Sequence, residues 1–232
     1  MREELTMNDL RNIKYCNMME KAVIQLIFSS GMAAANIIKL NYGDFLVSSR
    51  GFDRYVSKPS TSEYDKCHDH IGVWCLERLK TGNKYITLSS TETKKSLINY
   101  LLDRCRNEGF ISADQPLFIN ENGNRIDQVD ISKIFKKLSN KIGKKVRAHD
   151  LRKLFVKTLK DNNADPIFID MVLGHKIHPT IAAYYKYDIG YLKETYKNFE
   201  EYLILESDDK HLDLDDSLQL LKKLFFKRNS NE

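Results

Sequence analysis

The sequence predicts a mainly α-helical domain with one small antiparallel β-sheet, an α+β class. Apolar residues recur at i, i+3, i+4 and i+7 in several separate segments, which is the spacing of one helix face. One stretch, residues 73–88, instead alternates apolar and polar residues around a Thr-Gly-Asn turn, as a β-hairpin does. With 232 residues, 42% of them hydrophobic, the chain can build one large domain, or one domain with an appendage.

The N-terminal part is predicted to be helical up to Gly31. Apolar residues between Met19 and Ile27 lie at helical spacing, and Gly31 suits a helix C-terminus. A second short helix is expected over residues 32–40, with a turn over 41–45. Residues 46–72 are polar and have no period, so we predict an irregular insertion loop there.

The chain after the hairpin is predicted to be helical again, with one short strand-like piece. Each helix has an apolar stripe, and Asp165-Pro166 is a helix start that leads to Gly174 as a helix end. The expected segments are a helix over 90–109, a strand-like piece over 116–119, a turn over 121–124, a basic amphipathic helix over 131–142, a helix from about 149, and a helix over 167–173.

Basic residues concentrate over the helix at 131–142 and the start of the helix from about 149. The net charge of +5 alone does not establish a nucleic-acid partner, but nine Lys and Arg residues lie between Lys133 and Lys153 against one acid, Asp150. Such a stripe can be a solvated helix face or a track for phosphates; because it leads into His149, we favour the second. The predicted DNA contacts are Lys136, Lys137, Lys141, Lys144, Lys145, Arg147 and Lys153.

A candidate active site follows this stripe. His149 and Arg152 are three residues apart at the head of an apolar-periodic run, so one helix would place them on neighbouring positions. A helix start, a cation and an imidazole together suit a phosphate, and a nearby phenol is a possible nucleophile. A Leu-Gly-His with His175 and the pair Tyr184 and Tyr185 complete the stretch.

The order H-x-x-R, L-G-H and a Tyr nine residues later resembles the C-terminal signature of the tyrosine recombinases, the phage integrase family. The resemblance implies their catalytic-domain fold over residues 1–198. It also implies site-specific cutting and rejoining of double-stranded DNA through a 3′-phosphotyrosine, in recombination or integration of the kind viruses and mobile elements use. The implied roles are Tyr184 as nucleophile, with Tyr185 as the alternative, and Arg152, His149 and His175 around the phosphate. No cofactor is required.

The family carries a catalytic lysine on a hairpin, just before the turn, in a Lys-Thr-Gly context. Lys80 matches that context here. An ammonium on such a turn could protonate the leaving 5′-oxygen. Without the rest of the motif, Lys80 would be interpreted as a solubilising residue at a hairpin end.

One position departs from the family pattern. Where the family has Thr-Gly-Leu-Arg, this chain has Ser-Gly-Met-Ala, so the first catalytic arginine falls on Ala33, and the usual glutamate falls on Asn36. Alanine cannot replace a two-pronged guanidinium donor. Three explanations stay open: an engineered substitution, another basic residue (Lys39, Arg50 or Arg54), or a DNA-binding relic with little activity.

The tail, residues 199–232, is expected to carry an amphipathic helix over 213–228. Its apolar positions include Leu214, Leu218 and Leu221. The helix could pack on its own domain; the resemblance implies instead that it docks on a neighbouring copy, and so that the protein self-associates on DNA.

Besides the DNA-binding relic, an alternative function is a metal hydrolase that uses His68, His70 and His149. The C-H-x-H-x4-C spacing from Cys67 to Cys75 matches no common zinc site, so we predict no metal. The scattered cysteines indicate reduced thiols. Without a signal peptide or an apolar run near ~20 residues, we expect no membrane contact and a cytoplasmic location, in the host cytoplasm if a virus encodes the chain.

Overall fold

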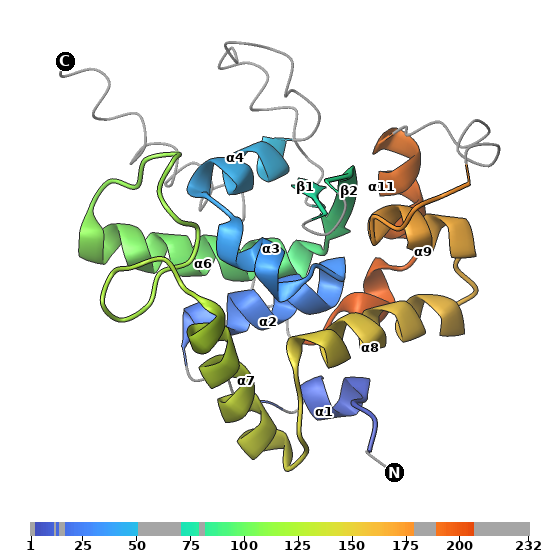
Figure 1. Ribbon diagram of the computed structural model, residues 1–232, viewed down its shortest axis with the longest axis horizontal. Coiled ribbons are helices and arrows are strands. Elements are labelled where there is room, and N and C mark those ends of the chain that lie inside the picture. The colour runs from blue at the N-terminus through green and yellow to red at the C-terminus, as the bar shows by residue number, and fades with distance from the viewer. Residues whose placement is uncertain are drawn as a thin grey trace.

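The computed structural model describes residues 3–11, 13, 17–50, 71–78, 82–178 and 189–206, with the backbone alone at Arg50. Helices dominate these residues, and β1 and β2 form one two-stranded antiparallel sheet, so the predicted fold class is confirmed (Figure 1). The elements are α1 (Met7–Arg11), α2 (Met18–Ser30), α3 (Ala34–Lys39), α4 (Tyr42–Arg50), β1 (Gly72–Glu77), β2 (Lys84–Ser89), α6 (Thr91–Glu108), α7 (Gln128–Ile142), α8 (Ala148–Asp161), α9 (Pro166–Val172), α11 (Ile189–Lys197) and the 3-10 helix η1 (Glu200–Leu203).

Helix α2 is the centre of the core. Its residues from Ala22 to Ser30 are all buried, as expected for a helix that is apolar on nearly every side. The side chain of Asn17 caps its start by accepting a hydrogen bond from the Glu20 amide at 2.7 Å. Gly31 ends it with a φ of 63°, as predicted. Because α2 packs against both α6 and α8, it fixes the position of α8 (Figure 1).

The predicted hairpin is confirmed. Strands β1 and β2 pair from Gly72↔Ser89 to Glu77↔Lys84. Trp74 and Tyr85 are buried on this sheet, and α9 and α11 lie beside β2 (Figure 1). The hairpin therefore connects the core to the end of α9, where His175 follows. Residues 79–81, with Lys80, lie outside the described residues.

The segment after Asn41 differs from the expectation of a turn and an irregular loop from residue 46. It is helical as α4 up to Arg50, so that prediction is wrong for residues 42–50. The Asp44 carboxylate accepts a hydrogen bond from the Asn41 amide at 2.9 Å, and Tyr42, Phe45 and Ser48 are buried at a spacing of three residues. Gly43 and two serines lower helix propensity and hid this pattern. Residues 51–70, with Arg54, Cys67, His68 and His70, lie outside the described residues, whereas Cys75, the last residue of the hypothetical zinc pattern, lies on β1.

Helices α7 and α8 carry most of the predicted site and form as expected. On α8, Leu151, Leu154, Phe155 and Leu159 are buried. Helix α7 begins with a capping box between Asp127 and Asp130 and ends at Gly143, whose φ is 75°. The linker 143–147 then rises to the start of α8 (Figure 1).

The packed body continues past residue 198. Leu203 and Leu205 are buried, and the amides of Leu205 and Glu206 donate to the Glu92 carboxylate at 2.9 and 2.8 Å. Residues 207–232, with the predicted amphipathic helix, lie outside the described residues. Within the described chain, no helix combines the length and apolar character that a membrane crossing needs.

Candidate active site and nucleic-acid interface

Arg152 on α8 joins three elements at one point. One terminal nitrogen of its guanidinium donates to the Gly31 carbonyl at the end of α2, and the other donates to the Leu173 carbonyl after α9 at 3.1 Å. The Ser30 carbonyl, one residue before Gly31, accepts from the Thr87 hydroxyl of β2 at 2.7 Å. The side chain that the sequence singled out therefore lies where α2, α8, α9 and the hairpin meet.

Tyr85 of β2 lies against Arg152, although its sequence context predicts no role for it in the site. Burial raises the pKa of Tyr85, while the positive charges of Arg152 and Arg78 and a hydrogen-bonding contact with Arg152 lower it. The side-chain nitrogen of Asn36 donates to the Tyr85 hydroxyl at 3.3 Å and to the Glu77 carbonyl at 3.4 Å. Strand alternation marks Tyr85 only as an inward-facing residue, so its contact with Arg152 had no signal in the sequence.

The pKa of Arg152 is itself lowered. Burial is the largest cause, Tyr85 opposes the change, and the positive charge of Arg78 adds to it. A bound anion would favour the charged form of Arg152. The local electrostatics thus suit a phosphate.

His175 lies just past α9 and is held from two sides. Its amide donates to the Asp170 carbonyl at 2.9 Å, and its Nδ1 is 2.8 Å from Asp170 Oδ1. A carboxylate on Nδ1 fixes the ring orientation and leaves Nε2 for another partner. Gly174 has a φ of 66°, and a Cβ there would lie 2.5 Å from the ring of Tyr85. Only glycine lets this turn approach the hairpin so closely.

A small pocket of about 260 Å³ separates the hairpin from this turn, and its walls include Asn83, Lys84, Tyr85, Gly174, His175 and Lys176. Its lining brings His175 next to Tyr85. Since Tyr85 in turn contacts Arg152, the pocket connects two of the predicted site residues through a residue that was not predicted.

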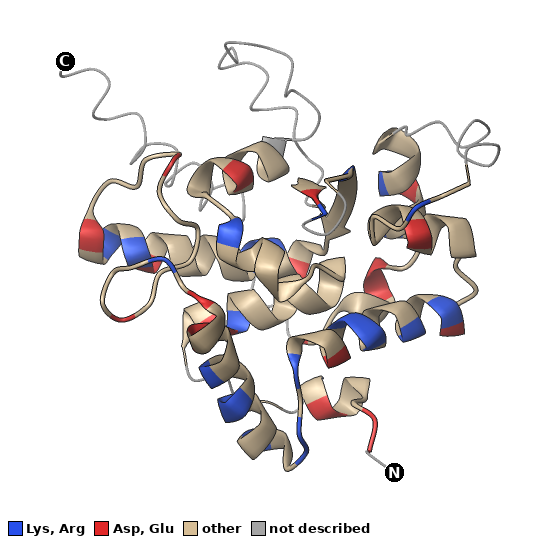
Figure 2. Cartoon of the chain, in the orientation of Figure 1, with Lys and Arg blue, Asp and Glu red and all other residues tan. Residues whose placement is uncertain are grey.

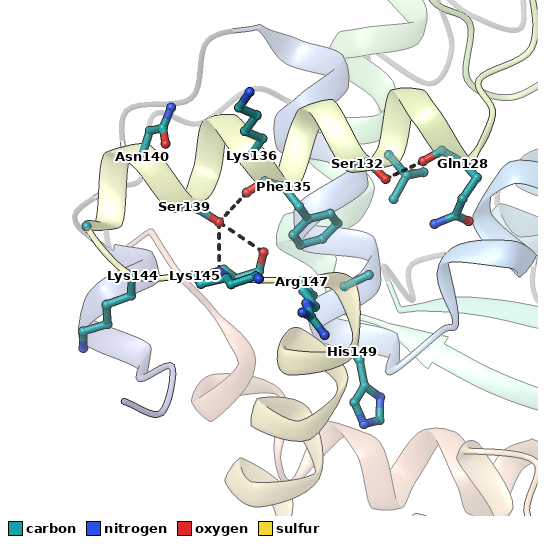
Figure 3. Close-up of a pocket in the computed structure, with 14 residues that line it drawn as sticks. Gln128, Ser132, Phe135, Lys136, Ser139, Asn140, Lys144, Lys145, Arg147 and His149 are labelled. Atoms are coloured by element: carbon teal, nitrogen blue, oxygen red, sulfur yellow. Dashed lines mark hydrogen bonds between the residues drawn. The ribbon is translucent and has the colours of Figure 1, made fainter. Parts of the chain in front are cut away.

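His149 occupies the first turn of α8, one turn before Arg152, and is exposed. It borders a larger groove of about 930 Å³ between α7, the linker and the start of α8 (Figure 3). Ser139 holds the groove together, because its hydroxyl donates to the Phe135 carbonyl at 2.6 Å and accepts from the Val146 amide at 2.8 Å. Lys136, Lys144, Lys145 and Arg147 line the groove with His149.

Some of the basic residues of this region form ion pairs within the chain. Figure 2 shows Lys and Arg along α7, the linker and α8, with Asp and Glu on the adjacent N-terminal segment. Lys137 pairs with Glu20 at 2.7 Å, and Lys144 pairs with Asp9 at 3.1 Å and with Glu3 at 3.8 Å. Lys136 and Arg147 are exposed and are among the residues that line the groove. Lys141, Lys145 and Lys153 are exposed on the same helices and linker.

Three predicted residues lie outside the described part of the chain: Lys80, Tyr184 and Tyr185. Ala33 is described. It is exposed, precedes the first turn of α3 and has no side chain that could cap that helix. Among the described residues, no group of three or more His, Cys, Asp or Glu side chains could hold a metal ion. His68 and His70 are not among them.

Residues 3–189 match the sequence profile of the phage integrase family. The tyrosine recombinase XerD of Oceanobacillus iheyensis is 26% identical over 198 residues, which are 84% of this chain and 58% of that protein. The tyrosine recombinase XerC of Thermodesulfovibrio yellowstonii is 28% identical over 193 residues, 79% of this chain and 55% of that protein. The chain thus spans little more than half the length of these relatives.

Solved structures share the fold. The crystal structure of XerA recombinase superposes with a TM-score of 0.58 at 22% identity, over 85% of this chain and 65% of that chain. XerH site-specific recombinase, in a post-cleavage complex with its palindromic difH substrate, superposes with a TM-score of 0.54 at 19% identity, over 82% of this chain and 51% of that chain. Since the profile match covers most of the residues from the N-terminal helix to the start of α11, the chain belongs to the phage integrase family.

Proposed function

We propose that this chain is the catalytic domain of a site-specific DNA recombinase, which cuts and rejoins double-stranded DNA through a 3′-phosphotyrosine. The observation that carries the proposal is the junction at Arg152, where one guanidinium connects α2, α8 and the turn before His175. This junction adjoins a basic groove on the same helix α8. A phosphate at the junction would therefore belong to a nucleic-acid backbone that the groove contacts.

The proposed reaction is a transesterification. The Tyr184 phenol gives up its proton, to His149 or to water, and its oxygen attacks the phosphorus; the bond to the 5′-oxygen breaks, and the leaving oxygen takes a proton from the Lys80 ammonium. Arg152 and His175 stabilise the charge that develops on the phosphate oxygens, and His149 orients the phosphate or exchanges protons. A phenol with a pKa near 10 is weakly nucleophilic at neutral pH, and adjacent cations would lower that pKa. Because the phosphotyrosine conserves the bond energy, a second DNA end can reverse the step without ATP or a metal.

A nicked DNA duplex that traps the covalent intermediate tests the proposal. The unmodified chain should form an adduct that survives denaturing electrophoresis. Tyr184→Phe should abolish this adduct, while Tyr185→Phe, the matched control, should retain it. The reverse pattern would assign the nucleophile to Tyr185. An adduct that survives in both single variants and in the double variant would exclude this chemistry.

A second candidate function is a DNA-binding relic of the family. The observation that favours it is Ala33, an exposed residue without a charge at the position of the family's first catalytic arginine. In this case the chain binds DNA and forms no adduct on the nicked duplex. The binding and adduct measurements, made on one preparation, distinguish the two functions.

We also propose that residues 207–232 mediate self-association on DNA. The proposed location is the cytoplasm, or the host cytoplasm if a virus encodes the chain. The predicted apolar face of Leu214, Leu218 and Leu221 supports a docking helix. Sedimentation of the DNA complex should show more than one copy per duplex for the full chain and a single copy after truncation at Glu206. Equal stoichiometry for both chains would exclude a role of the tail in assembly.

A further inference from the structure

Arg152 has only part of its hydrogen-bonding capacity available for a phosphate. A guanidinium has five N–H donors, and Arg152 directs one from each terminal nitrogen to the carbonyls of Gly31 and Leu173. Phosphoryl transfer spreads negative charge over several oxygens and depends almost entirely on positioning and on positive charge. A second guanidinium at the same phosphate would supply what Arg152 cannot, and Ala33 does not provide it.

Arg78 is placed to provide it. This residue directly follows β1. Two backbone hydrogen bonds fix it in the turn: its amide donates to the Asn83 carbonyl at 2.9 Å, and its carbonyl accepts from the Gly82 amide at 2.7 Å. The Glu77 carbonyl, one residue earlier, accepts from the side-chain nitrogen of Asn36, which also donates to the Tyr85 hydroxyl. Arg78 is therefore the residue next to Glu77, where the Asn36 side chain connects α3 to both strands of the hairpin.

The half-buried side chain of Arg78 acts electrostatically on the same centre as Arg152. Burial is the largest cause of both shifts, raising the pKa of Tyr85 and lowering the pKa of Arg152; the positive charge of Arg78 is a smaller contribution that lowers the pKa of both groups. The hairpin register gives the geometry: Arg78 lies opposite Asn83, two positions along from the Leu76↔Tyr85 pair, so its side chain leaves the same face of the hairpin as the Tyr85 ring, which contacts Arg152. Like charges at a desolvated site repel unless an anion compensates them, so the arrangement suits a bound phosphate.

The other basic residues considered for this role are less suitable where the structure describes them. Lys39 is exposed in the last turn of α3, at the opposite end of that helix from Ala33. A lysine is also a point charge without the planar fork that fits two phosphate oxygens.

We propose that Arg78 is a catalytic residue whose guanidinium binds the scissile phosphate beside Arg152 and replaces the arginine that is missing at position 33. The inference rests on the proposed recombinase function. Arg78 forms no bond in the reaction; it stabilises the charge on the phosphate oxygens while the bond to Tyr184 forms and the bond to the 5′-oxygen breaks.

Single-turnover adduct formation on the nicked duplex tests this role in the full chain. Arg78→Ala should lower the rate constant about 10²–10³-fold, the usual effect of removing one donor to a transition-state oxyanion. Arg78→Lys should recover only part of the rate, because it lacks the fork. Arg106→Ala, which removes an exposed arginine near the end of α6, is the matched control and should leave the rate unchanged.

A rescue experiment separates catalysis from a structural role in the turn. Adding Ala33→Arg to Arg78→Ala should restore the rate at least about ten-fold, because a guanidinium from the start of α3 would take the same place. A turn that needs Arg78 for its shape would not be rescued from position 33. Arg78→Gln, which keeps the length of the side chain, serves as the second variant if Arg78→Ala fails to fold.

The remaining outcomes distinguish a failure of the Arg78 role from a failure of the proposed recombinase function. If the unmodified chain forms the adduct and Arg78→Ala forms it as fast as Arg106→Ala, Arg78 has no catalytic role while the recombinase function stands. A slow variant that Ala33→Arg does not rescue also overturns the catalytic role. If the unmodified chain binds the duplex and forms no adduct, both the proposed function and this inference fail.

Discussion

The Arg152 junction and the α7–α8 groove carry positive charge in different ways. At the junction, one partly buried guanidinium is fixed by two backbone carbonyls and contacts a buried phenol. In the groove, exposed side chains such as Lys136 and Arg147 line an open surface. Buried polar networks respond to one substitution as a unit, whereas exposed charges act nearly additively and are screened by salt. The comparison predicts large effects at the junction and graded, salt-dependent effects in the groove.

The largest effect is expected at Arg152. Arg152→Ala removes the cation and leaves the Gly31 and Leu173 carbonyls without this donor. We expect adduct formation to fall about 10³-fold or more, and the free energy of unfolding to fall by about 1–3 kcal/mol. Single-turnover assays and urea denaturation measure the two quantities. Arg152→Lys is the informative partner, since it keeps the charge but cannot reach both carbonyls with a planar fork.

If Arg152→Ala instead behaved like a groove variant, with a modest loss of affinity that high salt abolished, the contrast between the two regions would be wrong. Unchanged stability in Arg152→Ala would show that the two carbonyl contacts do not hold α2 and α9 together. Either result would remove the physical basis of the proposed site.

The next effect concerns the close approach of Gly174 to the hairpin. Gly174→Ala would place a Cβ 2.5 Å from the Tyr85 ring at a φ of 66°, whereas Gly143→Ala at the end of α7 has a φ of 75° and no atom within 4 Å. In both variants alanine must adopt the left-handed backbone conformation, which costs about 1–2 kcal/mol. Only Gly174→Ala also places a methyl group against the buried Tyr85 ring. We expect Gly174→Ala to be less stable than Gly143→Ala by about 1–3 kcal/mol.

Adduct formation extends this comparison. Gly174→Ala should also slow the reaction, because the turn that carries His175 must move away from Tyr85. Gly143→Ala should leave the rate constant nearly unchanged. Equal stabilities for the two variants would mean that the Tyr85 ring yields easily, and that the turn is not held by this contact.

The same two regions show what the sequence could predict. Helix α8 was predicted well because Leu151, Leu154, Phe155 and Leu159 repeat at helical spacing, and all four are buried. The same helical spacing places Arg152 and His149 about one turn apart. The hairpin followed from its alternation and its Thr-Gly-Asn turn.

Contacts between elements could not be predicted in this way. Tyr85 appears in the sequence as one inward residue of a strand, and nothing local shows that its hydroxyl meets Arg152 and Asn36. The pairing of Lys144 with Asp9 joins residues 135 positions apart, so Lys144 had the same appearance as Lys136 in the basic stripe. Helix α4 was not predicted because its glycine, Gly43, suggested a turn. In the structure this glycine instead allows a close packing contact, since a Cβ there would lie 2.9 Å from the Ala113 carbonyl oxygen.

Substitutions in the groove should produce the graded effects. Lys136→Ala and Arg147→Ala should each weaken duplex binding about three- to ten-fold at low salt and reduce the salt slope by about one. Lys144→Ala is the matched comparison, since its charge is already neutralised by Asp9 and Glu3. We expect Lys144→Ala to change affinity less than the other two and to lower the free energy of unfolding by less than about 1 kcal/mol.

Fluorescence anisotropy at several salt concentrations measures these slopes. Should Lys144→Ala weaken binding as much as Lys136→Ala, DNA must displace Asp9 from Lys144. The acidic N-terminal segment would then cover part of the interface in the free protein.

The smallest expected effect is the pH dependence of that N-terminal contact. Burial favours a higher pKa for Asp9, but hydrogen bonds from Thr6 and the Lys144 ammonium outweigh it, so the pKa of Asp9 is below its ordinary 3.8. A folded-state pKa below the unfolded one stabilises the fold above pH 3.8, and this contribution is lost as the pH falls through the folded value. The contribution should be only a few tenths of a kcal/mol, since solvent screens the pair.

Urea unfolding of the chain and of Asp9→Asn, measured from pH 6 down to the acid limit of the fold, would reveal this contribution. The two stability curves should differ at pH 6 and converge in acid, because protonation gives Asp9 the neutral side chain that the variant always has. Asp103→Asn, an exposed position on α6, controls for the change in net charge. Curves for Asp9→Asn that stay parallel to the parent at every pH would show that α1 does not depend on the Asp9–Lys144 pair. The groove would then be separate from the N-terminal segment, and its lysines could be treated as one set.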